Sequence, residues 1–392
     1  MVSSARKTSY RTFRPILKFY KVFFLPLVTS SIISANRVKY HKNDFNQFII
    51  FLIYSFFISA ITYFGTFSLI KNLKKRGFVG TNLNAIKSAE KVAEPGGLLG
   101  CVVYILAMVL FQMLFKDRQE NGLEFNLALV SIVIMTLLGL IDDILRLNWW
   151  IKIMGPIIAS FPLCLAYSET EFSPDRSFQW LSNRGYHGRM FTYAIIVLIT
   201  VFCANSINIY SGINGLEIGQ SLVMAFFITI YNSMDGCMGS SEKVTHPSWE
   251  RRMYTYYFTL PFIAVNASLL CFNWYPAKLF AGNVYTLFSG TFFSVITVIG
   301  ELWEVLPFLM LPQLINFLIS IPQLVGIVAC PRHRIPKFNI KTKKLENSKN
   351  YTLLNLFLLV CGPMSEEALT MALLCLQTLC SLAGLIYKYY ML

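Results

Sequence analysis

The stretch Val133-Ile-Met-Thr-Leu-Leu-Gly-Leu-Ile-Asp-Asp143 places a mostly apolar run directly before two adjacent carboxylates. Apolar runs of about 20 residues recur along the chain, and a bilayer requires such runs whereas a soluble core does not. Only 14% of the residues are charged, compared with about 25% in soluble domains. The alternation expected of an outer-membrane barrel is not visible. The sequence therefore predicts an all-α, polytopic membrane protein.

About ten membrane spans can be drawn on both sides of this stretch. They cover about 47–70, 97–115, 125–141, 149–167, 190–210, 215–231, 253–272, 279–299, 302–322 and 368–390. We expect 47–392 to form one membrane domain with a loop at 323–350. The preceding residues 1–46 form a basic extension, whose apolar run near 23–33 suits an interfacial or signal-like segment.

The distribution of Lys and Arg predicts the orientation in the membrane. Loops after the first, third, fifth, seventh and ninth spans hold about 15 of these residues, and the intervening loops hold about eight. The positive-inside rule places the richer set in the cytosol and both termini in the lumen, although nine basic residues in 1–46 argue for the opposite orientation. The sequon Asn350-Tyr-Thr352 then lies in the cytosol and is expected to stay unglycosylated.

Net charge and cysteine spacing limit the classes of partner. The net charge of +14 fits a basic face over anionic lipid, or a phosphate-rich substrate, better than it fits nucleic acid. None of the nine cysteines forms a CxxC pair, so neither a zinc site nor a disulfide framework is indicated.

Two polar features interrupt the apolar pattern near the middle of the chain. Carboxylates such as Asp142 and Asp143 at a membrane edge are costly unless a cation joins them, and magnesium bound with substrate phosphates is a common solution. A solvated helix end is the alternative. Further along, three amides and an acid stand close together, at Asn205, Asn208, Asn214 and Glu217. Such groups face water or protein, and hydrogen bonding between helices is the alternative.

A basic loop supplies the third feature. Arg332, His333 and Arg334 lie between Pro331 and Pro336. Arginine holds phosphate in a bidentate fork, and histidine donates hydrogen bonds to sugar or phosphate. Contact with lipid headgroups is the alternative. Acids for a metal, amides for a base or sugar, and arginines for phosphate together indicate a nucleotide-sugar site.

From about residue 47 onward the chain resembles the polyprenyl-phosphate N-acetylhexosamine-1-phosphate transferases. The resemblance is strongest to the eukaryotic branch, which moves GlcNAc-1-phosphate from UDP-GlcNAc to dolichyl phosphate. The motifs that carry it are Leu140-Ile-Asp-Asp-Ile-Leu145, Asn205-Ser-Ile-Asn-Ile-Tyr-Ser-Gly-Ile-Asn-Gly-Leu-Glu217, Asn273-Trp-Tyr-Pro276 and Pro331-Arg-His-Arg-Ile-Pro336.

The resemblance implies a role for each matching residue. The implied catalytic set is Asp142, Asp143, Lys152, Arg332, His333 and Arg334. The implied substrate-binding set is Glu94, Trp149, Asn205, Gly212, Asn214, Glu217 and Phe280, with the Phe280 ring against uracil and Trp149 beside the lipid phosphate. Asn208 and Asn283 are the implied ligands of Mg²⁺.

The resemblance also implies the setting of the reaction. The expected product is dolichyl-diphospho-GlcNAc, the first lipid-linked intermediate of protein N-glycosylation, and UMP is released. The enzyme is expected in the endoplasmic reticulum membrane with its site facing the cytosol. Its expected partners are UDP-GlcNAc, dolichyl phosphate and membrane lipid, without nucleic acid, and a homodimer is one option for its assembly.

Three departures from the family pattern keep other functions open. The family's Gly-Asp after Phe280 is Gly282-Asn283, its Gly-x-Asp-Leu is Gly80-Thr-Asn-Leu83, and Arg146 replaces a common Asn. Loss of acidic groups leaves weaker magnesium binding, another metal preference or a nearly inactive paralogue open. A sister enzyme with another donor, a lipid or solute transporter, and a structural membrane subunit are the further alternatives.

Overall fold

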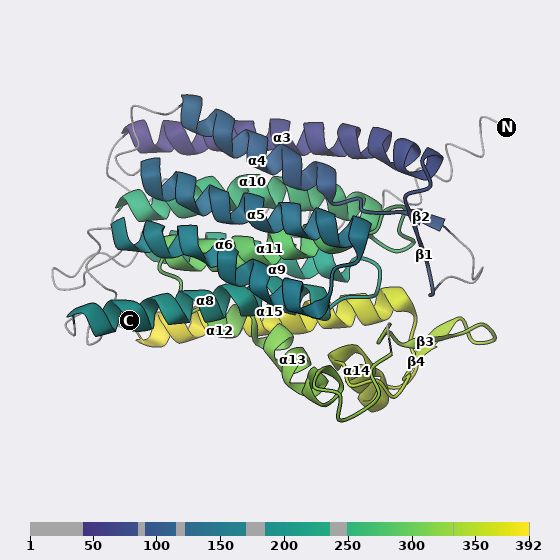
Figure 1. The fold of residues 1–392 in the computed structure, drawn as a ribbon. Coiled ribbons are helices and arrows are strands. Elements are labelled where there is room, and N and C mark those ends of the chain that lie inside the picture. Colours follow the sequence, from purple (N-terminus) through teal and green to yellow (C-terminus); the bar gives the residue numbers. More distant parts are fainter. Residues whose placement is uncertain are drawn as a thin grey trace.

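The protein folds as a bundle of roughly parallel helices, with two small β-hairpins at one end (Figure 1). The computed structural model describes residues 42–84, 91–114, 122–169, 185–235, 249–331 and 333–391. Residues 1–41 and Arg332 therefore lie outside the described residues. The helices are α3 (Lys42–Lys75), α4 (Leu98–Leu114), α5 (Gly122–Leu145), α6 (Trp149–Glu169), α8 (Gly185–Ile209), α9 (Leu216–Asp235), α10 (Trp249–Asn273), α11 (Gly282–Ile299), α12 (Leu306–Leu309), α13 (Leu311–Leu324), α14 (Leu353–Cys361) and α15 (Glu366–Met391).

The predicted all-α membrane class is confirmed. Within the described ranges, seven helices are long and apolar enough to cross a membrane, and three shorter apolar helices cover 98–114, 216–232 and 311–324. These ten segments overlap the ten predicted spans, but the shorter three do not by themselves establish ten crossings. Only helices and closed barrels satisfy all backbone groups inside a bilayer, so the apolar runs fold as helices.

Two sequence predictions about helices were wrong in detail. The predicted span 302–322 divides into α12 and α13 at Met310. Pro312 near the start of α13 has no N–H to continue the hydrogen-bond ladder of α12, so a new helix begins there. Helix α14 lies between the predicted loop 323–350 and the predicted span 368–390, where no helix was predicted, because its nine residues are too few to span a bilayer.

One end of the bundle, which we call the strand end, gathers the loops of the site. The hairpin of β1 (Val79–Thr81) and β2 (Lys91–Ala93) lies there with the hairpin of β3 (Lys337–Asn339) and β4 (Lys344–Glu346). Both pairs are antiparallel, with Gly80 opposite Val92 and Phe338 opposite Leu345. Described parts of the loops predicted to face the cytosol meet at this end, whereas α3 begins and α15 finishes at the opposite end (Figure 1).

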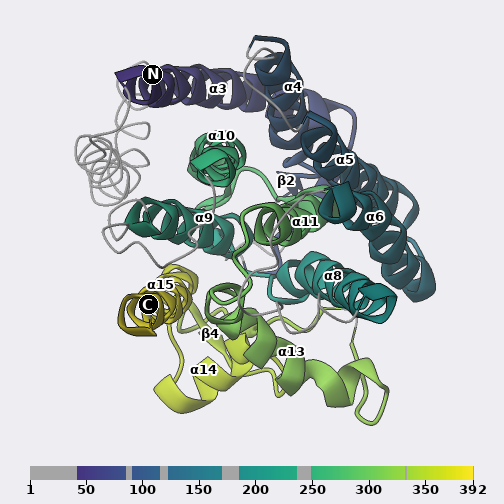
Figure 2. The ribbon, with the colours of Figure 1, turned by 90° about the vertical axis from the view of Figure 1, so that its left-hand side faces the viewer.

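Helix α11 forms the centre of the bundle. Its residues from Val284 to Ile299 are all buried, and the view along the helices shows α5, α6, α8, α9 and α10 around it (Figure 2). Two of its hydroxyls are satisfied locally: Thr291 and Thr297 donate to carbonyls four residues earlier at 2.8 and 2.7 Å. Local bonds of this kind let polar side chains lie inside an apolar bundle.

A small residue brings α5 against the start of α11. A Cβ added at Gly139 would lie 2.6 Å from the backbone of both Asn283 and Val284. Small residues allow helix backbones to approach closely in membranes. Glycine at this position therefore sets the last turn of α5, which carries the acidic pair, directly over the first turn of α11.

Candidate active site

A cavity of about 880 Å³ opens at the strand end between these loops. Segments from six parts of the chain line it: 77–84, 94–95, 142–146, 208–217, 273–286 and 333–335. Side chains that line it and were predicted as site residues are Glu94, Asp142, Asp143, Asn208, Asn214, Glu217, Phe280, Asn283 and His333, together with the backbone of Gly212. The acidic pair and the basic loop therefore lie on the same side of the bundle, as predicted.

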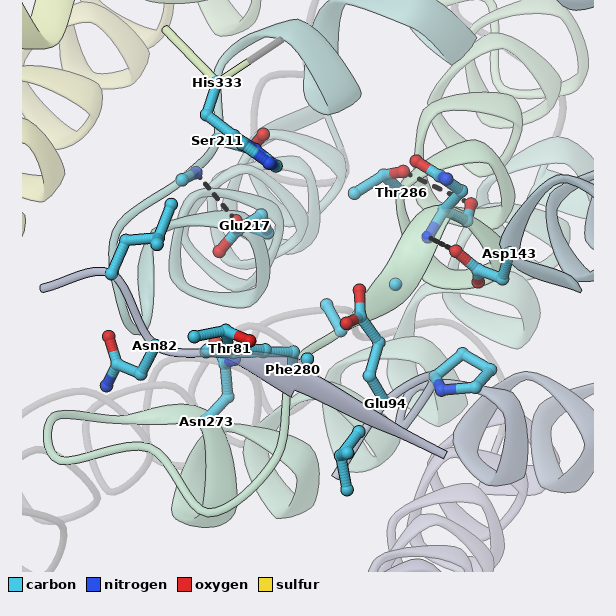
Figure 3. Close-up of a pocket in the computed structure, with 18 of the residues that line it drawn as sticks. Thr81, Asn82, Glu94, Asp143, Ser211, Glu217, Asn273, Phe280, Thr286 and His333 are labelled. Carbon is cyan, nitrogen blue, oxygen red and sulfur yellow. Dashed lines mark hydrogen bonds between the residues drawn. The ribbon is translucent and has the colours of Figure 1, made fainter. Parts of the chain in front are cut away.

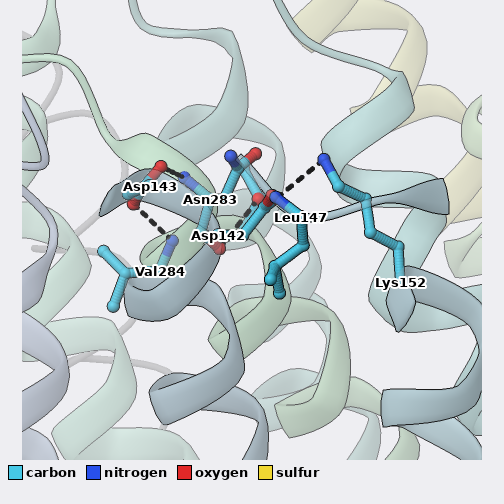
Figure 4. Close-up of polar contacts among 7 residues, drawn as sticks. Asp142, Asp143, Leu147, Lys152, Asn283 and Val284 are labelled. Carbon is cyan, nitrogen blue, oxygen red and sulfur yellow. Dashed lines mark hydrogen bonds and ion pairs between the residues drawn. The ribbon is translucent and has the colours of Figure 1, made fainter. Parts of the chain in front are cut away.

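Asp143 anchors the beginning of α11. Its Oδ1 accepts the backbone N–H of Asn283 at 2.8 Å, and its Oδ2 accepts that of Val284 at 2.9 Å (Figure 4). The first N–H groups of a helix have no partner within the helix, and a carboxylate is favoured at that positive end. Gly282 has φ +79°, and a Cβ there would lie 2.7 Å from Asp143 Oδ2, so glycine is required for this contact.

Asp142 pairs with a lysine of another helix, α6. Its buried carboxylate lies 2.8 Å from Lys152 Nζ of α6, and its Oδ1 accepts the Leu147 N–H at 2.9 Å (Figure 4). The second bond closes the 146–148 connection, where Arg146 has φ 54°. The two adjacent acids therefore have different roles. Asp143 fixes the start of α11, and Asp142 holds Lys152 at the edge of the cavity.

The turn between α8 and α9 is held by one side chain of α9 and one of α10. Glu217 Oε1 accepts the Gly212 N–H at 2.9 Å (Figure 3). Asn273 Oδ1 of α10 accepts the Gly215 N–H at 3.1 Å, while its Nδ2 donates to Leu279 O at 2.9 Å. Asn273 thus ties this turn to the segment leading into Phe280.

Phe280 and Glu94 are fixed against each other by backbone pairing. The Phe280 N–H donates to Ala93 O at 2.9 Å, and Phe280 O accepts the Gly96 N–H at 2.8 Å. The Glu94 side chain points from beside Phe280 into the cavity toward the side where Asp143 lies (Figure 3). Burial raises the pKa of the Glu94 carboxyl. A ring and a half-buried acid thus form one wall of the cavity.

The basic loop is fixed from behind by α14 and the segment before it. Asn355 Nδ2 donates to Arg334 O at 3.2 Å, and Ser348 Oγ donates to Ile335 O at 2.8 Å. His333 lines the cavity. Among the described residues, the buried Nη1 of Arg334 has no hydrogen-bond partner, which leaves a guanidinium donor available for an anion. The prediction for Arg332 falls on a residue outside the described part.

Four predicted site residues do not line the cavity. Lys152 reaches its edge through Asp142, and Arg334 lies beside His333. Trp149 lies at the start of α6 with 58% of its surface exposed. The side-chain amide of Asn205 donates to Val201 O at 2.9 Å within its own helix, so it serves α8 locally.

Several lining residues were not predicted from the sequence. Asn82 and Asn84 follow β1, and Ser211 and Thr286 lie at the α8–α9 turn and in α11. The substitution of Asn82 within a family motif was the only available signal, because short polar loop residues are too common to single out. These residues can be assigned to the site only from the tertiary structure, which brings them to the cavity.

The oxygen donors of the cavity suit magnesium that is completed by a substrate. The amide side chains of Asn208 and Asn283 both line the cavity, and neither has a hydrogen-bond partner among the described residues. No group of three or more His, Cys, Asp or Glu side chains in the described ranges is arranged to hold a metal. Magnesium commonly uses few protein ligands and completes its shell with water and phosphate oxygens.

Comparison with known proteins gives a consistent picture. The pattern of glycosyl transferase family 4 matches residues 125–301. A UDP-N-acetylglucosamine–dolichyl-phosphate N-acetylglucosaminephosphotransferase of Dictyostelium discoideum is 39% identical over 322 residues, covering 77% of this chain and 78% of the relative. A protein of the same name from Schizosaccharomyces pombe is 30% identical, and the match covers 81% of this chain and 86% of the relative. A phospho-N-acetylmuramoyl-pentapeptide-transferase of Dictyoglomus turgidum is 23% identical, and the match covers 64% of this chain and 76% of the relative.

Proposed function

The chain belongs to glycosyl transferase family 4, and from that premise we propose that it transfers GlcNAc-1-phosphate from UDP-GlcNAc to dolichyl phosphate. A lipid phosphate oxygen bonds to the β-phosphorus of the donor. The bond from that phosphorus to the bridging oxygen breaks, and UMP leaves with this oxygen. The convergence of Asp142, Asn208, Phe280 and His333 on one cavity is the observation that supports this activity.

Catalysis then depends on positioning and charge neutralisation. The Phe280 ring and the 212–214 turn bind the nucleoside, and His333 contacts the sugar. Arg334 neutralises charge on the diphosphate. The acceptor phosphate is largely ionised near neutral pH, so it needs little deprotonation. Lys152, held beside Asp142 at 2.8 Å, supplies a cation for it.

Magnesium completes the proposed site. Asn208 and Asn283, which line the cavity, are its proposed ligands through their side-chain oxygens. When bound, the ion neutralises charge on the diphosphate. An amide in place of a carboxylate at residue 283 removes one formal charge, so we expect a higher magnesium requirement than an aspartate there would give.

The acceptor lipid is proposed to approach sideways from the bilayer. Trp149 and Trp150 at the start of α6 are 58% and 71% exposed, and such aromatic residues favour the membrane interface. Multiple apolar helices place the protein in a membrane. We further propose the endoplasmic reticulum as that membrane, with the strand end in the cytosol and N-glycosylation as the pathway served.

Purified protein tests the function directly. UMP release from UDP-GlcNAc is measured with dolichyl phosphate and Mg²⁺, with undecaprenyl phosphate and other UDP-sugars as alternatives. We expect UMP only when both proposed substrates are present. Release with another donor would identify a sister enzyme, and no release with any pair would indicate an inactive paralogue, a transporter or a structural subunit.

The variant Asn283→Asp tests the proposed metal position. A carboxylate beside the cavity adds charge for the cation, so the magnesium concentration for half-maximal activity is expected to fall several-fold, by about 3- to 10-fold. Activity is titrated with Mg²⁺ for wild type and variant. An unchanged half-activating concentration would show that residue 283 binds no metal.

The sequon at Asn350 tests the orientation. Its side chain donates to Ser348 Oγ at 2.8 Å and accepts from Gln323 Nε2 at 3.0 Å, in the segment that carries the basic loop. If this segment faces the cytosol, no glycan is added. In a glycosylating host, endoglycosidase treatment is expected to leave the migration of wild type the same as that of Asn350→Gln. A glycan lost in Asn350→Gln would place the strand end in the lumen.

A further inference from the structure

The first turn of the C-terminal helix α15 holds the backbone of Asn214 from both sides. Glu366 Oε1 accepts the Asn214 N–H at 2.8 Å, and Thr370 Oγ1 donates to Asn214 O at 3.0 Å. Glu366 is 4% exposed and Thr370 is 1% exposed. Neither side chain lines the cavity, yet together they fix a residue that does.

The same carboxylate oxygen reaches a second wall of the cavity. Asn84 Nδ2 donates to Glu366 Oε1 at 3.2 Å and to Gly212 O at 3.4 Å. The Asn84 N–H in turn donates to Asn82 Oδ1 at 3.0 Å. Glu366 therefore links the segment after β1 to the α8–α9 turn, although the linked residues are 282 and 152 positions away in the chain.

The linked residues carry polar atoms that the described part of the protein does not pair. Asn84 Oδ1 and Asn214 Nδ2 are buried without a hydrogen-bond partner there, and so is the second oxygen of Glu366. Buried polar atoms are normally paired in folded proteins. Asn84 offers an acceptor and Asn214 a donor, on two cavity-lining residues that share one Glu366 oxygen, and they suit a ligand edge that offers both a donor and an acceptor. A pyrimidine base has such an edge.

We propose that Glu366 is a positioning residue for nucleotide recognition, which holds Asn84 and Asn214 for the base of the UDP-sugar. This inference rests on the proposed function and adds a residue from α15 to it. Both bonds use Oε1, so a glutamine in the same place keeps the carbonyl acceptor, whereas alanine removes it. We expect the effect on the base and not on the diphosphate, because within the described ranges Glu366 bonds to Asn84 and Asn214 and to neither the acidic pair nor the basic loop.

Kinetics with three variants test the proposal. In Glu366→Ala we expect the KM for UDP-GlcNAc and the inhibition constant of UMP to rise by about tenfold or more, with kcat within about threefold of wild type. Glu366→Gln is expected to restore both within about threefold. Glu367→Ala is the matched control, since Glu367 is the next acid on α15 and is exposed.

Inhibition by pyrophosphate, which lacks a base, separates positioning from general damage. Its inhibition constant is expected to stay unchanged in Glu366→Ala. The proposal would be overturned if Glu366→Ala raised the inhibition constants of UMP and pyrophosphate equally, or if it left the inhibition constant of UMP unchanged.

Direct binding of UMP is measured separately from turnover, through the shift in melting temperature that UMP causes. If wild type binds UMP but releases none from UDP-GlcNAc, the proposed function fails while loss of UMP binding in Glu366→Ala still supports this role. If the wild type turns over and Glu366→Ala binds UMP normally, only the present inference fails.

Discussion

Replacing Arg334 by alanine is expected to lower the rate of UMP release by about 10²-fold or more, the usual loss when one preorganised charge-stabilising donor is removed. Arg334 directly follows His333, which lines the cavity, and its buried Nη1 has no hydrogen-bond partner in the described residues. Its loop is anchored through Arg334 O and Ile335 O, so the backbone keeps its place when the side chain is shortened. The effect should therefore fall on turnover more than on melting temperature.

A neighbouring lysine supplies the control for this prediction. Lys337→Ala removes the same charge three residues later, where the side chain is exposed, and is expected to retain activity within about threefold because exposed charges interact weakly with a distant site. Near-normal turnover by purified Arg334→Ala would remove this arginine from the mechanism. Equal losses in both variants would indicate a general effect of loop charge.

Asp143→Asn is expected to reduce activity by about 10- to 100-fold and also to lower the melting temperature. The amide replaces one carboxylate oxygen by a donor that faces the N–H of Asn283 or Val284. One charge-assisted bond is lost, and such bonds contribute about 1.5–3 kcal/mol, which corresponds to this range of rates if it is expressed in the transition state. The start of α11 would shift, and Asn283 with it.

A double-mutant cycle tests whether Asp143 acts through Asn283. Asn283→Ala keeps the backbone N–H that Asp143 binds and removes only the amide, so it should lower activity with little change in melting temperature. If both residues serve one function, the double variant loses little more activity than Asp143→Asn alone. Fully multiplicative losses would assign Asp143 an independent role, such as direct contact with the acceptor phosphate.

The sequence predicted the two acids but not their separate partners. Adjacent residues on a helix point about 100° apart, so Asp142 and Asp143 meet different neighbours. One faces Lys152 of α6 and the other faces the first N–H groups of α11. The partner of each acid depends on how α5, α6 and α11 pack, and the close approach of α5 to α11 at Gly139 contributes to that packing. The local sequence pattern does not determine it.

The residues behind the cavity were beyond sequence reasoning for a similar reason. Glu366 and Glu367 are adjacent acids at the start of a helix, and nothing local distinguishes them. Helix α15 turns the first into the protein against Asn214, and it leaves the second at the surface, where it accepts the Trp274 Nε1–H at 3.4 Å. Asn205 shows the converse: it was predicted for the site, but among the described residues its side chain bonds only within its own helix.

The sequence by itself determined the membrane class, the positions of most helices, and the three polar clusters that meet at one end. It could do so because a bilayer forces each apolar run to satisfy its own backbone, which makes helix formation a local property. Only the tertiary structure decided which acid binds which helix, where α12 gives way to α13, and how Glu366 reaches Asn84 and Asn214. Those contacts join residues far apart in the chain, and their geometry depends on how neighbouring helices pack.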